Sequence, residues 1–256
     1  MSYAVVQTTL DVPPVESLRV AFQSLPQLTD NDAALMARDA FGILVSSLSL
    51  DDANTLQLVL KNHGVEAHVV DERNLPVLAA RKRIMQADAL AEQLILYDSL
   101  NRPTPTDWSR VALIAAGGVN LTEFKRVAKT RIRHRMVGIA RCGMSVPVVE
   151  TDIKHSEKNV SNLVLEIFLD GGASRYHILA DKFRYTYLGE KAGNRSADNF
   201  VMLVCDLIRY AETAMVNRGA VAMTESPPRT FKYPTRHAFE EESIWLLFSS
   251  VKPAEE

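Results

Sequence analysis

The sequence predicts an α+β protein, in which an N-terminal βααβαβ sandwich is followed by a β-rich domain. Three observations favour this fold class. Residues 1–72 alternate between strand-like and helix-like hydrophobic patterns in the order β-α-α-β-α-β. After residue 76 most patterns are those of short strands bounded by glycine, proline and asparagine. One long helical pattern, at residues 196–212, follows these strands and is expected to cap them.

The six N-terminal elements have clear local signals. Pro13 and Pro14 suit the start of a helix, because a missing N–H costs little there. Thr29 is a candidate N-cap for the second helix, and Gly64 is expected to end the third. The elements are expected at residues 3–10, 15–25, about 30–40, 41–48, 49–62 and 65–70.

The second part is predicted to consist mainly of strands, with turns between them. Residues 99–106 are expected to be a turn-rich connection, and Gly117 and Gly118 to end the strand before them. Asp170-Gly171-Gly172 predicts a hairpin turn. The expected strands lie at residues 83–90, 92–98, 108–115, 163–169, 175–179 and 183–188.

The C-terminal residues differ in composition from the strands before them. Residues 226–234 are expected to be a proline-rich linker, and residues 238–249 a short helix with three glutamates in its first turn. We therefore expect three parts, at residues 1–76, 77–223 and 224–256, with a long insertion at 119–160 in the second.

Composition and charge exclude several classes of protein. The formal net charge of −2 gives no general attraction to nucleic acid or to an anionic membrane. Charge is uneven, with a net of −6 for residues 1–76 and +6 for residues 77–223. Cys142 and Cys205 show no C-x-x-C pairing, so neither a disulfide nor a zinc site is expected. The start of the sequence lacks a signal-peptide pattern and no apolar run is long enough to cross a membrane, which favours the cytoplasm.

The N-terminal part resembles two related families. Ser49-Leu-Asp-Asp-Ala-Asn and Leu60-Lys-Asn-His-Gly-Val-Glu-Ala-His-Val look like the third helix, glycine cap and last strand of the ribosomal stalk protein's C-terminal domain. The same element order is found in the small adaptor that delivers substrates to a Clp-type protease. The resemblance implies a fold used mostly for protein contacts. Neither binding site carries over: residues 28–38 lack the stalk domain's glycines and lysines. Asp11 lies near the adaptor's peptide-binding position without the accompanying histidine.

Residues 81–215 resemble a bacterial pleckstrin-homology-like barrel. The resemblance rests on Leu94-Ile-Leu-Tyr-Asp-Ser and Thr106-Asp-Trp-Ser-Arg-Val-Ala-Leu-Ile, which look like a strand, a turn and a tryptophan-bearing strand of that family. It implies a barrel with one mouth closed by the helix at residues 199–212. The insertion would be a long loop or an extended hairpin, and loops of that length are usually functional or disordered.

A basic segment at residues 125–141 is the most distinctive candidate binding site. It contains seven Lys or Arg side chains within 17 residues. Alternation in a strand would place three arginines on one face, where they could hold a phosphate, a lipid headgroup or an acidic protein surface. The alternative is a solvated face, or one that pairs with the acidic N-terminal part. Aromatic residues are too few to favour nucleic acid. The candidate residues are Lys125, Arg126, Arg131, Arg133 and Arg135.

Two aromatic groups have both a binding and a structural interpretation. Tyr176, Phe183, Tyr185 and Tyr187 could form a ligand-facing surface, but cross-strand pairing in a core is the more ordinary interpretation. In the last helix, Trp245 and Phe248 could anchor the helix in the groove of a partner, or the helix could dock on its own chain.

Residues able to make or break bonds are not grouped in any familiar pattern. No G-x-S-x-G turn or phosphate loop is present, and the six histidines show no metal-ligand spacing. We therefore expect neither catalytic residues nor a cofactor or metal. The leading hypothesis is a non-enzymatic intracellular binding or adaptor protein with a protein partner. The alternatives are an anionic ligand at the basic segment and an enzyme of unrecognised type, and homo-oligomerisation through the last helix stays open.

Overall fold

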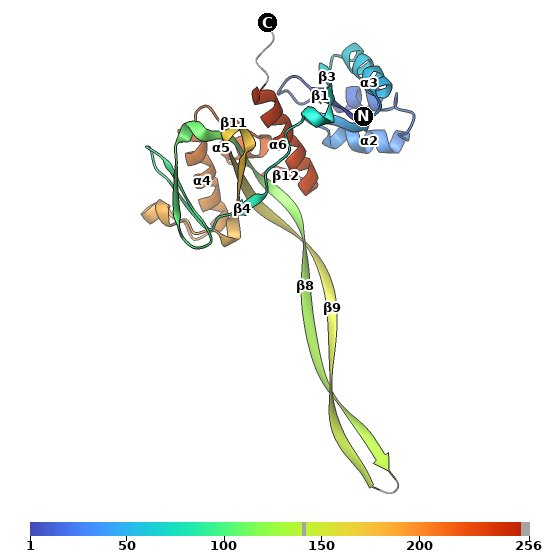
Figure 1. Cartoon of the computed structure of the whole chain (residues 1–256), viewed down its shortest axis with the longest axis vertical. Coiled ribbons are helices and arrows are strands. Elements are labelled where there is room, and N and C mark those ends of the chain that lie inside the picture. The colour runs from blue at the N-terminus through green and yellow to red at the C-terminus, as the bar shows by residue number, and fades with distance from the viewer. Residues whose placement is uncertain (140–141, 252–256) are drawn as a thin grey trace. The chain divides into compact units, whose positions relative to one another are not determined.

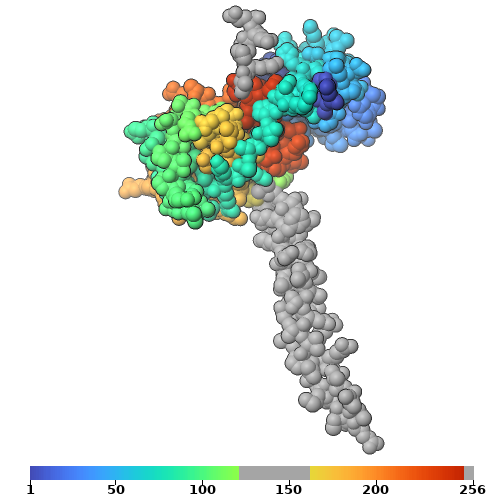
Figure 2. All heavy atoms as spheres, viewed as in Figure 1, coloured from blue at the N-terminus to red at the C-terminus, as the bar shows by residue number. Residues whose placement is uncertain are grey.

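The computed structural model describes the backbone of residues 1–139 and 142–251. Side chains are described for residues 1–120 and 162–250, which are coloured in Figure 2. The chain is an α+β protein, as predicted. It forms two compact units, one comprising residues 1–119 and 162–256 and the other residues 120–161. The three-part division expected from the sequence stays a prediction.

The N-terminal elements have the predicted βααβαβ order (Figure 1). Thr29 caps the second helix through a reciprocal pair of hydrogen bonds with Asp32, and the Ser49 side chain caps the third. Gly64 ends the third helix with φ of +74°. The elements are β1 (Tyr3–Gln7), α1 (Val15–Phe22), α2 (Asp30–Asp39), β2 (Ile43–Leu48), α3 (Leu50–Asn62) and β3 (Ala67–Asp71).

The first sheet has the strand order β2-β1-β3, and both pairings are antiparallel. Phe22, Leu56 and Leu60 from the helices pack with Val5 and Val45 from the strands in one buried cluster. Strand β1 is buried on both faces, because its side chains alternate between this cluster and the opposite side. Since β1 lies in the centre, β2 and β3 form the two edges of this sheet.

The largest sheet has the strand order β11-β8-β9-β10-β4. Strands β9 and β10 form the predicted hairpin, which is joined at Asp170–Gly172. The short strands β11 and β12 both pair in parallel with β8. The bounds are β4 (Arg81–Arg83), β8 (Val111–Ile139), β9 (Cys142–Leu169), β10 (Ser174–Leu179), β11 (Met215–Val216) and β12 (Lys232–Tyr233).

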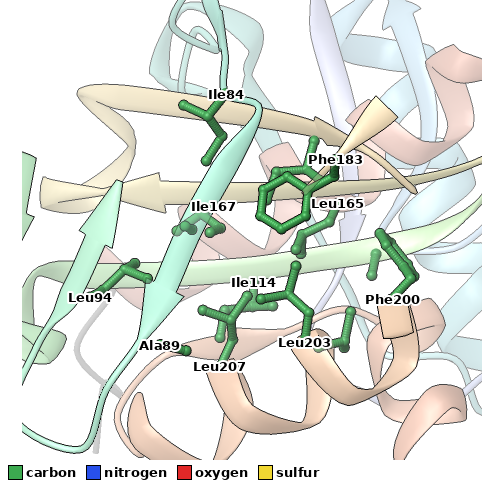
Figure 3. Packing of buried hydrophobic residues seen from close by; sticks show 14 of the residues in the cluster. Ile84, Ala89, Leu94, Ile114, Leu165, Ile167, Phe183, Phe200, Leu203 and Leu207 are labelled. Carbon is green, nitrogen blue, oxygen red and sulfur yellow. The ribbon is translucent and has the colours of Figure 1, made fainter. Parts of the chain in front are cut away.

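A third sheet, the antiparallel meander β5 (Gln86–Ala89), β6 (Leu94–Tyr97) and β7 (Pro103–Thr106), contributes to the second core. Figure 3 shows Phe200, Leu203 and Leu207 of α4 (Ser196–Tyr210) facing side chains of β8 and β9. All three are buried in one cluster that also contains Leu94 and Ile114. The apolar face of α4 therefore covers the strands as predicted, although no sheet closes into a barrel among the described residues.

Several local predictions in the second part are wrong. Strand β8 continues through Gly117 and Gly118. A Cβ atom at Gly117 would lie 2.6 Å from the ring of Tyr233, so the glycine permits a close approach and does not end the strand. Residues 103–106 form β7, although a turn-rich connection was expected.

The predicted strand at residues 183–188 is replaced by 3₁₀ turns at Thr186–Lys191. The hydroxyls of Tyr185 and Tyr187 donate hydrogen bonds to Ala180 O and to Asp206, which ties this segment to its neighbours. Phe183 and Tyr185 are buried in the second core with their rings in edge contact. This arrangement agrees with the core interpretation of the aromatic group.

The C-terminal part is more ordered than the sequence predicts. The helix α5 (Arg218–Thr224) was not predicted, and β12 lies within the expected linker. The last helix, α6, runs over Arg236–Val251 and so begins two residues earlier than expected. Its three glutamates lie after the first turn, where they form ion pairs. None of the helices in the described part has the length and hydropathy that a membrane crossing requires.

Candidate functional site

Among the residues with described side chains lies a cleft of about 580 Å³, which we call the Arg218 cleft. Its lining comes from the loop after β1, from Phe41 just before β2, from β11, from α5 and the segment after it, and from α6. The lining residues that matter for its chemistry are Leu10, Phe41, Arg218, Val221, Glu225, Arg229, Phe231 and Glu242.

Asn217 positions Arg218 by fixing the start of α5 against β8. The Asn217 Oδ1 atom accepts hydrogen bonds from the Ala220 and Ala116 backbone N–H groups, both at 2.9 Å. The Asn217 side chain is buried and also donates to Ala116 O at 3.1 Å and to the Tyr233 hydroxyl at 2.8 Å. Gly219 directly follows Arg218, and a Cβ atom there would lie 2.0 Å from Ala116 O, so only glycine fits at position 219.

The carboxylate of Glu242, on α6, accepts hydrogen bonds from both the side chain and the backbone N–H of Arg218. The Arg218 Nε and Nη2 atoms donate to Glu242 Oε2 at 3.0 and 2.9 Å, and the Arg218 N–H donates to Oε1 at 2.8 Å. The Tyr233 hydroxyl donates to the same Oε2 at 3.0 Å. Burial raises the pKa of Tyr233, and the nearby Glu242 charge adds to this effect. The buried carboxylate is therefore fully engaged within the chain.

Two phenyl rings flank the Arg218 guanidinium. Its central carbon lies 3.6 Å from the ring centroid of Phe41 and 4.8 Å from that of Phe231. Cation–π contacts of this kind hold an arginine in one place and cover its faces. The second arginine of the cleft, Arg229, forms an ion pair with Glu225 at 2.5 Å.

The remaining wall of the cleft is apolar and partly open to solvent. Leu10 is 64% exposed and Val221 is 49% exposed. Two arginines are matched by two glutamates, so the charged residues lining the cleft carry no net charge. Such a surface is suited to an apolar group of a partner more than to a free ion.

A second polar group, buried beneath α6, joins this helix to β9 and β10. Arg175 donates to Glu166 Oε2 at 2.5 Å and to Glu240 Oε1 at 2.6 Å, while Arg236 contacts both glutamates. His177 Nδ1 lies 3.2 Å from Glu166 Oε1, but this atom has no hydrogen-bond partner among the described residues. Burial acts to raise the pKa of Glu166, but His177, Arg236 and Arg175 together lower it. The group is balanced in charge, which suits a structural role.

Of the two proposed residues whose side chains the structure describes, Trp245 lines the Arg218 cleft and Phe248 is not part of its lining. Lys125, Arg126, Arg131, Arg133 and Arg135 belong to β8, and their side chains lie outside the described residues.

The two aromatic residues proposed from the last helix lie on α6. Trp245 is only 1% exposed, and its Nε1 atom donates to Gln7 O at 2.9 Å. Phe248 is half-buried. A role as an anchor in a partner's groove would require α6 to leave this position.

Sequence reasoning missed Arg218, Phe231 and Glu242 as members of one site. The only local signal is Asn217, a good N-cap residue directly before Arg218. In the described part, no group of three histidine, cysteine, aspartate or glutamate side chains is arranged to hold a metal ion. No protein-family model, curated protein or solved structure matches this chain.

Proposed function

We propose that this chain is a binding or adaptor protein that acts through contacts with another protein. The Arg218 cleft would receive an apolar side chain of that partner. One observation carries the proposal: every charged side chain lining the cleft is already paired within the chain, while Leu10 and Val221 are left exposed. In this role the chain needs no catalytic residues and acts in the cytoplasm.

The geometry favours a rigid receptor surface over a flexible one. Arg218 is fixed by Glu242 and by two phenyl rings, and Asn217 fixes the helix that carries it. A preorganised wall loses little entropy on binding, so even a small apolar contact can contribute to affinity. A buried apolar anchor surrounded by polar contacts is the usual centre of a protein interface.

Val221→Glu is the test of this proposal, with Leu58→Glu as the matched control. Leu58 is 61% exposed on α3 and lies outside the lining of the Arg218 cleft. Each full-length variant would be expressed in cells, and its partners would be identified by chemical crosslinking and mass spectrometry. We expect Val221→Glu to lose at least one partner that both wild type and Leu58→Glu retain. An identical set of partners for all three proteins would refute the proposed use of the cleft.

The basic segment supports a second proposal, which is an anionic partner or lipid headgroup at Arg131, Arg133 and Arg135. The sequence observation behind it is the density of seven cationic side chains in 17 residues. Changing all three arginines to glutamate should abolish salt-sensitive binding to anionic liposomes or to an acidic partner. Equal liposome binding and equal partner retention in wild type and variant would end this proposal.

A further inference from the structure

A groove of about 340 Å³ is lined by residues of β2 and shares Phe41 and Arg218 with the Arg218 cleft. Four consecutive residues of β2, Ile43 to Ser46, line it. One wall is the end of α2, with Leu35 and Asp39, and the other is the start of α6, with Glu241. The groove therefore combines a strand edge with two helical walls.

Strand β2 is an edge strand, since within the described backbone it pairs with β1 alone in the sheet order β2-β1-β3. Alternate N–H and C=O groups of an edge strand point away from the sheet and can pair with another extended chain. The edge ends at Ser47, which has φ of +63° and donates its N–H to Glu72. Four residues of β2 correspond to about 13 Å of strand, which is enough to pair with a short segment.

The charges lining this groove are unbalanced. Arg218 is neutralised by Glu242, which leaves the carboxylates of Asp39 and Glu241. Among the residues with described side chains, Asp39 has no ion pair and Glu241 pairs with His237 alone, which is itself mostly exposed. Burial raises the pKa of Glu241, so a nearby cation would stabilise its charged form. Leu35, at 62% exposure, adds an apolar surface beside the two acids.

We propose that the β2 edge binds an extended protein segment carrying a lysine or arginine, which adds as a fourth strand and places its cation at Asp39 and Glu241. An apolar side chain of the same segment would cover Leu35. Main-chain pairing supplies affinity in this mode, and the two carboxylates select a basic residue. This proposal goes beyond the Arg218 cleft, and it does not depend on what that cleft binds.

The test uses a phage-displayed library of random eight-residue peptides, selected against the full-length chain. Selected peptides would be titrated against wild type and against Asp39→Asn/Glu241→Gln. The control is Asp51→Asn/Glu92→Gln, which removes the same charge from two residues outside the groove lining. We expect the selected peptides to be rich in lysine or arginine between apolar residues. Their affinity should fall about tenfold or more for the groove variant, by loss of charged hydrogen bonds, and stay unchanged for the control.

Hydrogen exchange separates strand addition from contact through side chains alone. Binding of a selected peptide should slow exchange of the backbone amides at residues 43–46, because added strand pairing protects alternate N–H groups. The proposal is overturned if selection yields no peptide that distinguishes the groove variant from the control. It is equally overturned if the selected peptides lack basic residues or if residues 43–46 gain no protection. A dimer in light scattering that a selected peptide dissociates would assign the edge to a second copy of the chain and would also overturn the proposal.

Discussion

The contact between Gly42 and Trp245 offers the sharpest test of how α6 is placed. Gly42 has φ of +77°, and a Cβ atom there would lie 2.8 Å from both Cγ and Cδ2 of the Trp245 indole. The indole cannot move aside easily, because it is buried, packs edge-on against Phe41 at 5.0 Å and donates a hydrogen bond to Gln7 O. Gly42→Ala should therefore be destabilising for two separate reasons.

The two contributions can be estimated separately. Placing an alanine at positive φ costs about 1–2 kcal/mol. Forcing an extra methyl group into a packed site costs a further ~1–3 kcal/mol. Gly64→Ala is the matched control, because Gly64 has φ of +74° but no atom within 4 Å of its Cβ position. We expect Gly64→Ala to show only the first cost and Gly42→Ala to show both.

A double-mutant cycle with Trp245→Ala isolates the contact. Trp245→Ala alone should cost about 3–5 kcal/mol, since it removes a buried aromatic side chain. In that background the clash is absent, so Gly42→Ala should cost only the backbone contribution. The coupling energy between the two positions should then be about 1–3 kcal/mol.

Guanidinium denaturation followed by far-UV circular dichroism is the suitable assay, because it does not depend on the tryptophan that is removed. Stability would be compared through the midpoint and the m-value for wild type, the three single variants and the double variant. Additive costs in the cycle, or equal costs for Gly42→Ala and Gly64→Ala, would refute the reasoning. Either result would mean that α6 does not pack on Gly42 in solution.

Three further changes test the polar interior. Gly219→Ala should destabilise the chain by more than ~3 kcal/mol, the upper end of ordinary overpacking, because the clash is with the backbone of Ala116 at 2.0 Å; a melting temperature near that of wild type would contradict this. Tyr233→Phe should cost about 1–3 kcal/mol in chemical denaturation, since Asn217 loses an acceptor; no measurable loss would mean that water replaces the hydroxyl. The lowered pKa of Glu166 stabilises the folded state at neutral pH, and this stabilisation is lost as the pH falls through the folded pKa, below the ordinary value of 4.5. The melting-temperature gap between wild type and Glu166→Gln should therefore be largest near neutral pH and should narrow in acid, whereas a constant gap would exclude this contribution.

The N-terminal half could be predicted well because its signals are local. A capping residue such as Thr29 or Ser49 acts on N–H groups within three positions, and Gly64 acts through its own φ. The hairpin at Asp170–Gly172 and the helix α4 are also specified by neighbouring residues. Each of these elements was found because the physical cause lies inside a window of a few residues.

The second half was predicted less well because its signals act over long distances. Gly117 looks like a strand end until Tyr233, more than 100 residues later, is known to lie on it. The Arg218 cleft likewise requires Phe41, Phe231 and Glu242 to meet, and no spacing in the sequence relates them. For the helix that carries Trp245, the sequence left two alternatives open. An amphipathic pattern does not distinguish a helix that docks on its own chain from one that docks on another.

Helix α6 connects the two candidate surfaces to the rest of the fold. Glu240 ties the helix to Arg175 of the large sheet, Glu242 ties it to Arg218 of α5, and Trp245 ties it to the end of β1. The same helix supplies a wall of both the Arg218 cleft and the β2 groove. A ligand that binds either surface only when α6 is in place must stabilise the docked position of the helix. At a free ligand concentration one hundred times the Kd, this stabilisation is about 2.7 kcal/mol. Binding at these surfaces and the attachment of α6 are therefore linked, and a change that weakens one should weaken the other.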